Sequence, residues 1–396
     1  MPKEVVRARW GVILLFWLNG VAWSSILPRY PEIKAALEAS NTAFGIAVGL
    51  GPVGGLIAGL FTARLVRRFS SATVATTTLL LGILTLNAVA NAPTLALFAA
   101  SLATMAAMDA ITDISMNAHG LRVQKLYGRT ILNSFHGWWS IGAVCGGILG
   151  SAAAQVDMAL WLQAVLAAVV FGGMALFART LLLPGKDQAP ADEEAAAELR
   201  PQRRIPASLW LRLIALGLLG ASVGLVEESA ASWGAIYMDG MFEVMPFVAG
   251  LAFVALQGAQ MIGRFTGDAL VNRIGARPAV TLGVSVAALG MGLAVAFPHP
   301  ASTIIGFACA GWGIATGIPS AMHAADELPG MAHGSGLTFV TWLMRLGFFA
   351  GPPLIGIVGD TVSLRWALIV VPITALIALA LTPALTPPRN ARPTVL

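Results

Sequence analysis

Residues 93–120 read PTLALFAASLATMAAMDAITDISMNAHG, and this stretch decides what kind of protein the chain forms. It is longer than the roughly 20 apolar residues that carry a helix across a bilayer. The apolar run is continuous and does not alternate with polar residues as the strands of a membrane β-barrel do. The stretch therefore predicts a transmembrane helix with two acidic residues, Asp109 and Asp113, inside the bilayer.

The rest of the chain has the same character. Of its 396 residues, 57% are hydrophobic and only 11% are charged, and the mean hydropathy is +0.79. A water-soluble domain carries about 25% charged residues, so lipid must be the solvent for most of this chain. We expect an all-α membrane protein of twelve transmembrane helices in two pseudo-symmetric six-helix halves around a central cavity. The predicted spans are 10–27, 42–61, 73–90, 93–120, 131–154, 158–177, 209–238, 246–264, 278–297, 303–325, 334–359 and 364–385.

The distribution of basic residues predicts the orientation. With the N-terminus placed inside, all but four of the 24 Lys and Arg residues fall on the cytoplasmic side. Arg29, Lys34 and Arg365 fall outside, and Arg345 lies within a span. Because cytoplasmic loops are rich in Lys and Arg, this bias predicts a multi-pass inner (plasma) membrane protein with both termini cytoplasmic. The first apolar run lacks a small-residue cleavage site and is predicted to be a span, not a removed signal peptide.

A charged segment interrupts the apolar pattern near the middle of the chain, where residues 190–204 read PADEEAAAELRPQRR. Such composition is typical of a solvated linker. We therefore expect a cytoplasmic linker over 179–208, between an N-terminal six-helix half (1–178) and a C-terminal six-helix half (209–396).

The two halves also match as repeats. A shift of 209 residues superposes Gly54 on Gly263 and Gly147 on Gly356. Transporters built from duplicated halves bind their substrate at the interface of the repeats, near the membrane midplane. The repeat therefore predicts a site between the halves.

Two segments carry a family resemblance. Residues 59–68 read GLFTARLVRR, and 268–277 read DALVNRIGAR. Both resemble the cytoplasmic signature of the major facilitator superfamily: Gly, three residues, Asp, Arg, one residue, Gly, then two basic residues. The first copy, placed in the loop between spans two and three, has Ala63 in place of the Asp and Val66 in place of the Gly. The resemblance implies a monomeric secondary transporter that works by alternating access. It implies cytoplasmic gating by Arg64, Arg68, Asn272, Arg273 and Arg277.

A narrower resemblance points to the fucose-permease-like branch. It rests on DISMNAHG at 113–120, NSFHGWWSIG at 133–142 and GPPLIG at 351–356. The branch carries an acid, associated with proton coupling, four residues before an Asn, and Asp113 matches it. The branch's second acid aligns near Ser24, which does not titrate in the working range, so this chain departs from the two-acid mechanism.

Ionisable residues inside a membrane usually face a cavity or a partner, so each one is a candidate for function. Asp109, Asp113 and Asn117 are spaced four apart and share one face of a helix. An acid that binds and releases a proton is what a proton-coupled carrier requires. His136 is expected at a depth similar to that of Asp113, so the two could meet. We predict proton coupling by Asp113, Asp109 and His136; structural capping or helix-interface roles are the alternatives.

Arg345 is always charged and needs an acidic partner or an anionic substrate group. Its candidate partners are Asp109, Asp113, Glu227 and Glu228; a static pair or an Arg that extends to the cytoplasm is the alternative.

Aromatic rings beside an Asn would suit a polyol, whereas membrane-interface anchoring is the alternative for each Trp. The residues predicted to line the substrate cavity are Asn117, Arg345, Asn19, Trp17, Trp139 and Glu228.

The sequence favours a proton-coupled carrier of a small polar solute, sugars included. One alternative is an exporter of amphipathic compounds by proton antiport. It would have apolar and Met side chains around a single acid; Met105, Met108, Met116 and Met344 keep it open. A transporter-like membrane sensor is the second alternative. We recognise no catalytic triad, phosphate-binding loop or metal-ligand cluster, so we expect no enzyme activity, no cofactor, no metal and no nucleic-acid partner.

Overall fold

The chain folds into a bundle of helices. The computed structural model describes residues 2–129, 131–185, 207–328 and 335–386. In these ranges eleven helical segments are long and apolar enough to cross a membrane. The helix α7 (Leu132–Gln155), 24 residues long, is the remaining long helix. Its glycine and serine content lowers its hydropathy, and with it the architecture is the predicted all-α fold of twelve spans.

The helices follow one another with short connections. In the first part of the chain they are α1 (Lys3–Ser24), η1 (Leu27–Arg29), α2 (Tyr30–Ala36), α3 (Asn41–Gly49), α4 (Gly51–Phe69), α5 (Ser71–Ala90), α6 (Leu95–Tyr127), α7, and α8 (Leu160–Leu181). In the second part they are α10 (Ala207–Ser229), the π-helical turn η2 (Ala230–Gly234), α11 (Ala235–Phe242), α12 (Pro246–Ile274), α13 (Ala276–Ala296), α14 (Pro300–Ile314), α15 (Gly317–Asp326), α16 (Ser335–Thr361), α17 (Leu364–Ala367), α18 (Val370–Leu381) and η3 (Thr382–Leu385).

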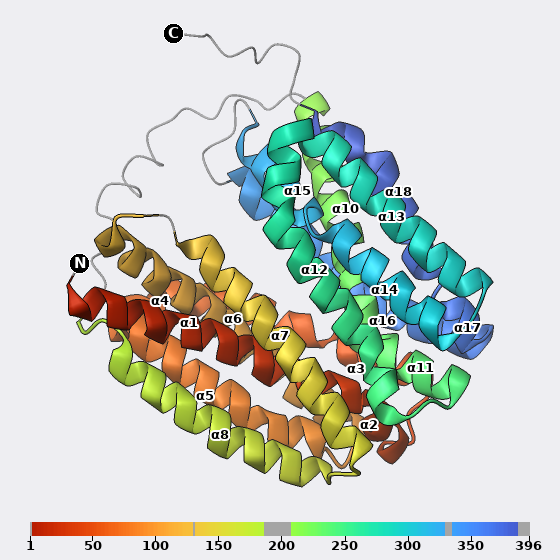
Figure 1. Ribbon diagram of the computed structural model, residues 1–396, viewed down its shortest axis with the longest axis horizontal. Helices are drawn as coiled ribbons and strands as arrows, with labels where there is room; N and C mark the ends of the chain where they lie inside the picture. The colour runs from red at the N-terminus through yellow and green to blue at the C-terminus, as the bar shows by residue number, and fades with distance from the viewer. Residues whose placement is uncertain (1, 130, 186–206, 329–334, 387–396) are drawn as a thin grey trace.

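Two bundles form, and they repeat one packing pattern. Helix α1 packs on α7 as α10 packs on α16, and α4 packs on α6 as α12 packs on α14. Figure 1 shows the first bundle in red to yellow-green and the second in green to blue. The boundary predicted at 179–208 stays a prediction, because 186–206 lie outside the described residues.

Glycine lets the paired helices approach closely. A Cβ added to Gly142 on α7 would lie 2.2 Å from the carbonyl oxygen of Trp17 on α1. On the same contact, a Cβ at Gly20 would lie 2.3 Å from the carbonyl oxygen of Trp139. Neither position tolerates a side chain without separating the helices. This is how small residues drive helix association in lipid, where no hydrophobic gain exists between helices.

The bundles contact each other through α3 with α16 and α7 with α12. Where α3 begins, the Asp360 carboxylate accepts the backbone N–H of Asn41 at 3.1 Å and of Thr42 at 2.7 Å. Nearby, the Trp233 indole N–H donates to the Pro352 carbonyl at 3.1 Å. The Trp233 bond lies within the second bundle, whereas the two Asp360 bonds join the bundles at one end of the molecule, beside α2 and α11 (Figure 1). We call this the opposite end.

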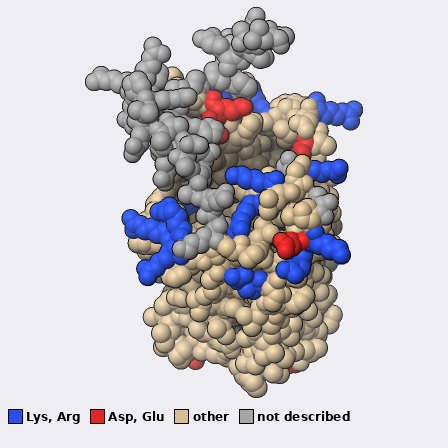
Figure 2. Space-filling view, turned by 90° about the vertical axis from the view of Figure 1, so that its left-hand side faces the viewer, with Lys and Arg blue, Asp and Glu red and all other residues tan. Residues whose placement is uncertain are grey.

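The other end carries the arginines in the last turns of α4 and α12, and we call it the basic end. Lys and Arg side chains gather there, as Figure 2 shows. The starts of α1 and α10 also lie at this end (Figure 1). The asymmetry agrees with the predicted orientation, which stays a prediction.

Several helices run further than predicted. The helix of the span predicted to end at Arg264 continues ten residues beyond it, because α12 ends at Ile274. Arg264 was counted as cytoplasmic but lies within the helix. The predicted loop at 59–68 was wrong: these residues are helical, and the chain turns only after α4, at Ser70 with φ 83°. Apolar periodicity does not mark where a helix leaves the membrane and continues in water.

Candidate functional site

A cavity of about 370 Å³ lies between the two bundles. Helices of both bundles line it, α6 from the first and α10, α12 and α16 from the second among them. Its charged lining residues are Asp109, Asp113, Glu227, Glu228 and Arg345. Of the residues predicted for the site, Asp109, Asp113, Trp139, Glu228 and Arg345 line this cavity.

Helix α6 presents the acidic face of the cavity. Thr94 caps its start by accepting the N–H of Leu97, and Gly128 ends it in the left-handed conformation. Because this helix is uninterrupted, the spacing of four residues places Asp109, Asp113 and Asn117 on one side of it, as predicted. Asp113 is exposed, whereas Asp109 is partly buried. The two carboxylates therefore see different amounts of solvent.

Asn117 connects Asp113 to His136. Its amide nitrogen donates to the Asp113 carboxylate at 3.0 Å, and its amide oxygen lies 3.1 Å from His136 Nε2. With the amide in this orientation, its oxygen accepts a hydrogen from Nε2. The direct meeting of Asp113 and His136 that the sequence suggested is replaced by contact through the amide. Asn117 and His136 lie beyond the cavity lining, and His136 is exposed.

Asn19 organises the second aspartate. Its amide nitrogen donates to Asp109 at 2.8 Å, and its amide oxygen accepts the indole N–H of Trp139 at 2.7 Å. Both amide groups of this buried Asn are used, so its orientation is fixed. Asn19 thus joins α1, α6 and α7 around the carboxylate.

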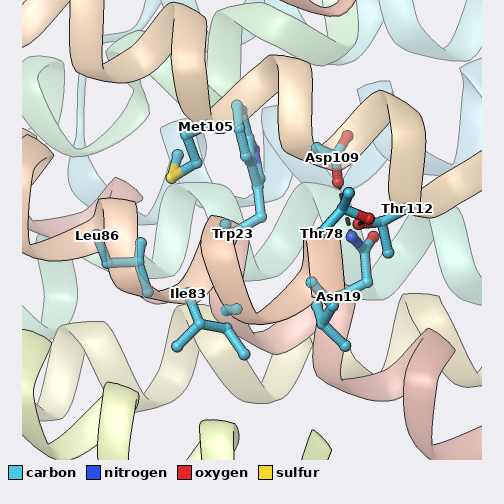
Figure 3. Close-up of a pocket in the computed structure, with 11 residues that line it drawn as sticks. Asn19, Trp23, Thr78, Ile83, Leu86, Met105, Asp109 and Thr112 are labelled. Atoms are coloured by element: carbon cyan, nitrogen blue, oxygen red, sulfur yellow. Dashed lines mark hydrogen bonds between the residues drawn. The ribbon is translucent and has the colours of Figure 1, made fainter. Parts of the chain in front are cut away.

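A small pocket of about 20 Å³ lies behind Asp109, between α1, α5 and α6. Figure 3 shows Asn19, Thr78 and Thr112 gathered beside the carboxylate. The two threonine hydroxyls lie 2.8 Å apart and also bond to backbone carbonyls of their own helices. Asp109 therefore has the central cavity on one side and a pocket of about the size of a water molecule on the other.

The second bundle supplies a different acidic pair. Glu227 accepts a hydrogen bond from Gln260 at 2.9 Å and pairs with Arg264 at 4.0 Å. Arg264 also donates to the Ser140 hydroxyl at 3.3 Å, and its guanidinium lies 6.0 Å from the ring centre of Trp139. It therefore contacts both bundles. Gln260 and Arg264 were not predicted as site residues. Together with Gln257 they are polar residues three and four apart in an apolar helix, which was the available signal.

Arg345 and Glu228 both line the cavity. Arg345, on α16, is an electrostatic neighbour of Asp109 and Asp113. It forms no ion pair or hydrogen bond with the described residues. Glu228 has Glu227 and Tyr30 as electrostatic neighbours. Within the described ranges, nothing donates a hydrogen bond to its carboxylate.

Trp17 lies elsewhere. Its ring packs edge-on against Phe171 of α8, 6.4 Å between centres. It is not among the residues that line the cavity. A face of α1 directed at α8 accounts for this, since neighbours on a helix point in different directions.

The residues predicted to gate lie at the basic end. Arg64 and Arg68 are exposed near the end of α4. Asn272 and Arg273 lie at the end of α12, where Gly275 turns the chain at φ 90°. That left-handed conformation favours glycine. Arg277 follows, also exposed, and bonds to the Thr386 hydroxyl at 3.3 Å. Their gating role stays a prediction.

Among the described residues, no group of His, Cys, Asp or Glu is arranged to hold a metal ion. Cys145 and Cys309 are free thiols.

Known proteins resemble this chain along almost its full length. An uncharacterized transporter, y4wD, of Sinorhizobium fredii is 28% identical over 379 residues, 95% of this chain and 97% of the relative. An uncharacterized MFS-type transporter of Yersinia pestis is 27% identical, covering 89% of each chain.

Solved structures share the fold. The nucleoside transporter NupG superposes with a TM-score of 0.73 at 15% identity, covering 97% of this chain and 98% of that one. FucP, a major facilitator superfamily transporter in the outward conformation, has a TM-score of 0.63 at 16% identity, covering 98% and 100%. At these identities the likeness concerns the fold.

The family model described as Major Facilitator Superfamily matches residues 228–395. The match covers the second signature copy, which keeps more of the family pattern than the first. The predicted resemblance to this superfamily is thereby confirmed by the family model over the second half of the chain and by relatives named as transporters along almost its full length. The chain is therefore similar to the transporters of the major facilitator superfamily.

Proposed function

We propose that this protein is a proton-coupled secondary transporter of a small polar solute, and that Asp113 carries the coupled proton. The observation that supports it most is the chain from Asp113 through Asn117 to His136 at the edge of the cavity. These contacts connect the Asp113 carboxylate, which lines the cavity, through the Asn117 amide to the exposed imidazole of His136.

The physical argument concerns the cost of charge. An ionised carboxylate is tolerated while water reaches it, but enclosing it in a low-dielectric interior is costly. Asp113 and Asp109 lie one turn apart and repel when both are ionised. Binding one proton removes the repulsion and lowers the cost of closing the cavity. Closure then depends on proton binding, which is what coupling means.

We propose that the two six-helix halves, 1–178 and 209–396, move against each other around the cavity. The bonds that Asp360 makes to the start of α3 hold the opposite end together. With the basic end at the cytoplasm, the described state faces inward. Arg64 and Arg273 then lie where the halves approach in the outward-facing state.

The composition of the cavity favours a polar solute over the amphipathic cargo of an antiport exporter. An exporter was expected to place Met and apolar groups around one acid. The cavity instead has four carboxylates, and of the four methionines that kept that alternative open only Met344 lines it.

The test is transport by purified protein in liposomes. A panel of polar solutes is offered with and without an imposed pH gradient, to wild type and Asp113→Asn. We expect a solute that accumulates with the gradient in the wild type. The variant should bind or exchange that solute without accumulating it. Asp157→Asn, two residues after the end of α7 and outside the cavity lining, is the matched control. Accumulation by Asp113→Asn at the wild-type level would refute the role of Asp113.

A further inference from the structure

The charges that line the cavity do not balance. Four carboxylates face it, from Asp109, Asp113, Glu227 and Glu228, against the single guanidinium of Arg345. Both pairs are adjacent on their helices, so like charges stand side by side in the cavity wall. Buried charges are usually paired, and an excess of one sign indicates that something else completes the site.

Most of these carboxylates already have partners. Glu227 has the amide of Gln260 and the guanidinium of Arg264. The two aspartates have Arg345 as a shared electrostatic neighbour and one amide donor each. A proton shared between the aspartates would remove their remaining excess charge. The imbalance therefore concentrates on one residue, Glu228.

Glu228 stands apart in its contacts. In the ranges that the structure describes, no donor bonds to its carboxylate and no cation pairs with it. Its electrostatic neighbours are Glu227, which repels it, and Tyr30, from the first bundle. A partly buried carboxylate that lines a cavity and has no protein partner is available to a ligand.

The backbone around Glu228 is also irregular. Helix α10 ends at Ser229 and continues into the π-helical turn Ala230–Gly234. The Ser232 hydroxyl donates to the Glu228 carbonyl at 2.7 Å across this turn. Such π-bulges are rare and occur often at functional sites. This observation is independent of the charge imbalance and points to the same residue.

Aromatic side chains complete the surroundings. The rings of Trp23, Tyr30, Phe253 and Phe348 line the same cavity. Cations bind favourably to the faces of such rings, and more so where water is excluded. A carboxylate without a partner, in a cavity walled by aromatic rings, is suited to an ammonium group and unsuited to an anion.

We infer that the transported solute is a small organic cation whose ammonium group binds Glu228. The inference rests on the proposed function in that it takes this cavity as the transport site. It separates two tasks: Glu228 on the second bundle holds the charge of the solute, and Asp113 on the first holds the coupled proton. The solute then links the two halves of the molecule while it is bound.

The test uses sets of compounds that share a carbon frame and differ in the charged group that they carry. Three frames are each offered as ammonium, hydroxyl and carboxylate forms: glucosamine, glucose and glucuronate; aminopropanediol, glycerol and glycerate; benzylamine, benzyl alcohol and benzoate. The unfolding temperature of the purified full-length protein is measured with each compound, and the affinity of the best member by calorimetry. We expect ammonium members to raise the unfolding temperature more than their neutral and anionic counterparts.

Variants assign the effect to Glu228. Glu228→Gln should weaken binding of the best ammonium compound roughly tenfold or more, as expected for the loss of a charged hydrogen bond. Glu227→Gln, one residue away on a carboxylate that already has Arg264, should weaken it less than about threefold. The unfolding temperature without ligand shows whether each variant is folded.

Three results would overturn the inference: no ammonium compound binds, a hydroxyl or carboxylate member binds at least as well, or Glu228→Gln binds like wild type. Failure of the proposed function looks different. Ammonium binding without pH-driven accumulation would refute proton coupling and leave Glu228 assigned. Gradient-driven accumulation of a neutral or anionic solute would refute the role of Glu228 and leave proton coupling in place.

Discussion

The contact between Asp360 and the start of α3 is expected to set the balance between conformations. The carboxylate accepts the N–H groups of Asn41 and Thr42, while Ser40 of the same segment accepts the N–H of Ala43. The first three N–H groups of α3 are thus satisfied, two of them from the other bundle. When the bundles separate at this end, Asp360 loses both bonds and water must replace it.

The size of the effect follows from the geometry. Removing a side chain that accepts the first N–H groups of a helix costs about 1 kcal/mol, within a range of about 0.5–2. The negative charge at a helix N-terminus adds about 0.3–1 kcal/mol at an exposed site such as this. Asp360→Ala should therefore disfavour the described state by about 1–2 kcal/mol, which is roughly a 5- to 30-fold change in the equilibrium constant. Asp360→Asn keeps an acceptor and should have a smaller effect.

The assay is single-molecule fluorescence energy transfer across the opposite end. Cys145 and Cys309 are first changed to Ser, and cysteines then replace Val156 and Val362, which are 67% and 65% exposed and directly follow α7 and α16. Asp360→Ala should raise the fraction of molecules with the larger dye separation.

Thr361→Ala is the control, because the Thr361 hydroxyl bonds only within its own helix, to Ile357. Unchanged populations in Asp360→Ala, or the same shift in Thr361→Ala, would refute the argument that Asp360 stabilises this state.

Two further predictions concern stability. Arg29 is 1% exposed and donates to Gln163 and to the backbone carbonyl of Met158, before α8. Arg29→Met leaves these buried acceptors unpaired and should lower the free energy of unfolding by about 2–4 kcal/mol. The measurement is the unfolding temperature in detergent, which should fall. An unchanged temperature would contradict this account. Gly142→Val should prevent folding, because its Cβ would lie 2.2 Å from the Trp17 carbonyl oxygen. Gly173→Ala is the control, because a Cβ there would have nothing within 4 Å. In size-exclusion chromatography the control should behave as wild type. A monodisperse Gly142→Val protein would refute it.

The fold was predictable because lipid imposes a simple rule on sequence: spans must be long, apolar and helical. The repeat was visible for a physical reason as well. Gly54 and Gly263 superpose in sequence, and each brings its helix against a backbone carbonyl of the neighbour, α4 on α6 and α12 on α14. Gly147 and Gly356 both lie between the bundles, against Phe253 and Asn41. Because close helix contacts require glycine, equivalent contacts in the two halves place glycines at equivalent positions in the two halves of the sequence.

The site was less predictable, because it depends on which side chains meet across helices. The face of α6 with Asp109 and Asp113 follows from helical spacing. The position of Asn117 between Asp113 and His136 depends on the distance between α6 and α7. The spacing of residues along the sequence does not specify that distance. Arg264 was misplaced because a basic residue after an apolar run usually marks the cytoplasmic end of a span. Here it pairs with Glu227 instead.

The most direct test of the central claim is the movement of protons driven by the solute. Liposomes with the protein and an internal pH dye start at equal pH on both sides, and an inward gradient of a solute that the protein binds is then imposed. Wild type should change the internal pH as the solute enters, and Asp113→Asn should exchange the solute while the internal pH stays constant. Solute entry by wild type without a pH change, or an equal pH change in Asp113→Asn, would contradict proton coupling through Asp113.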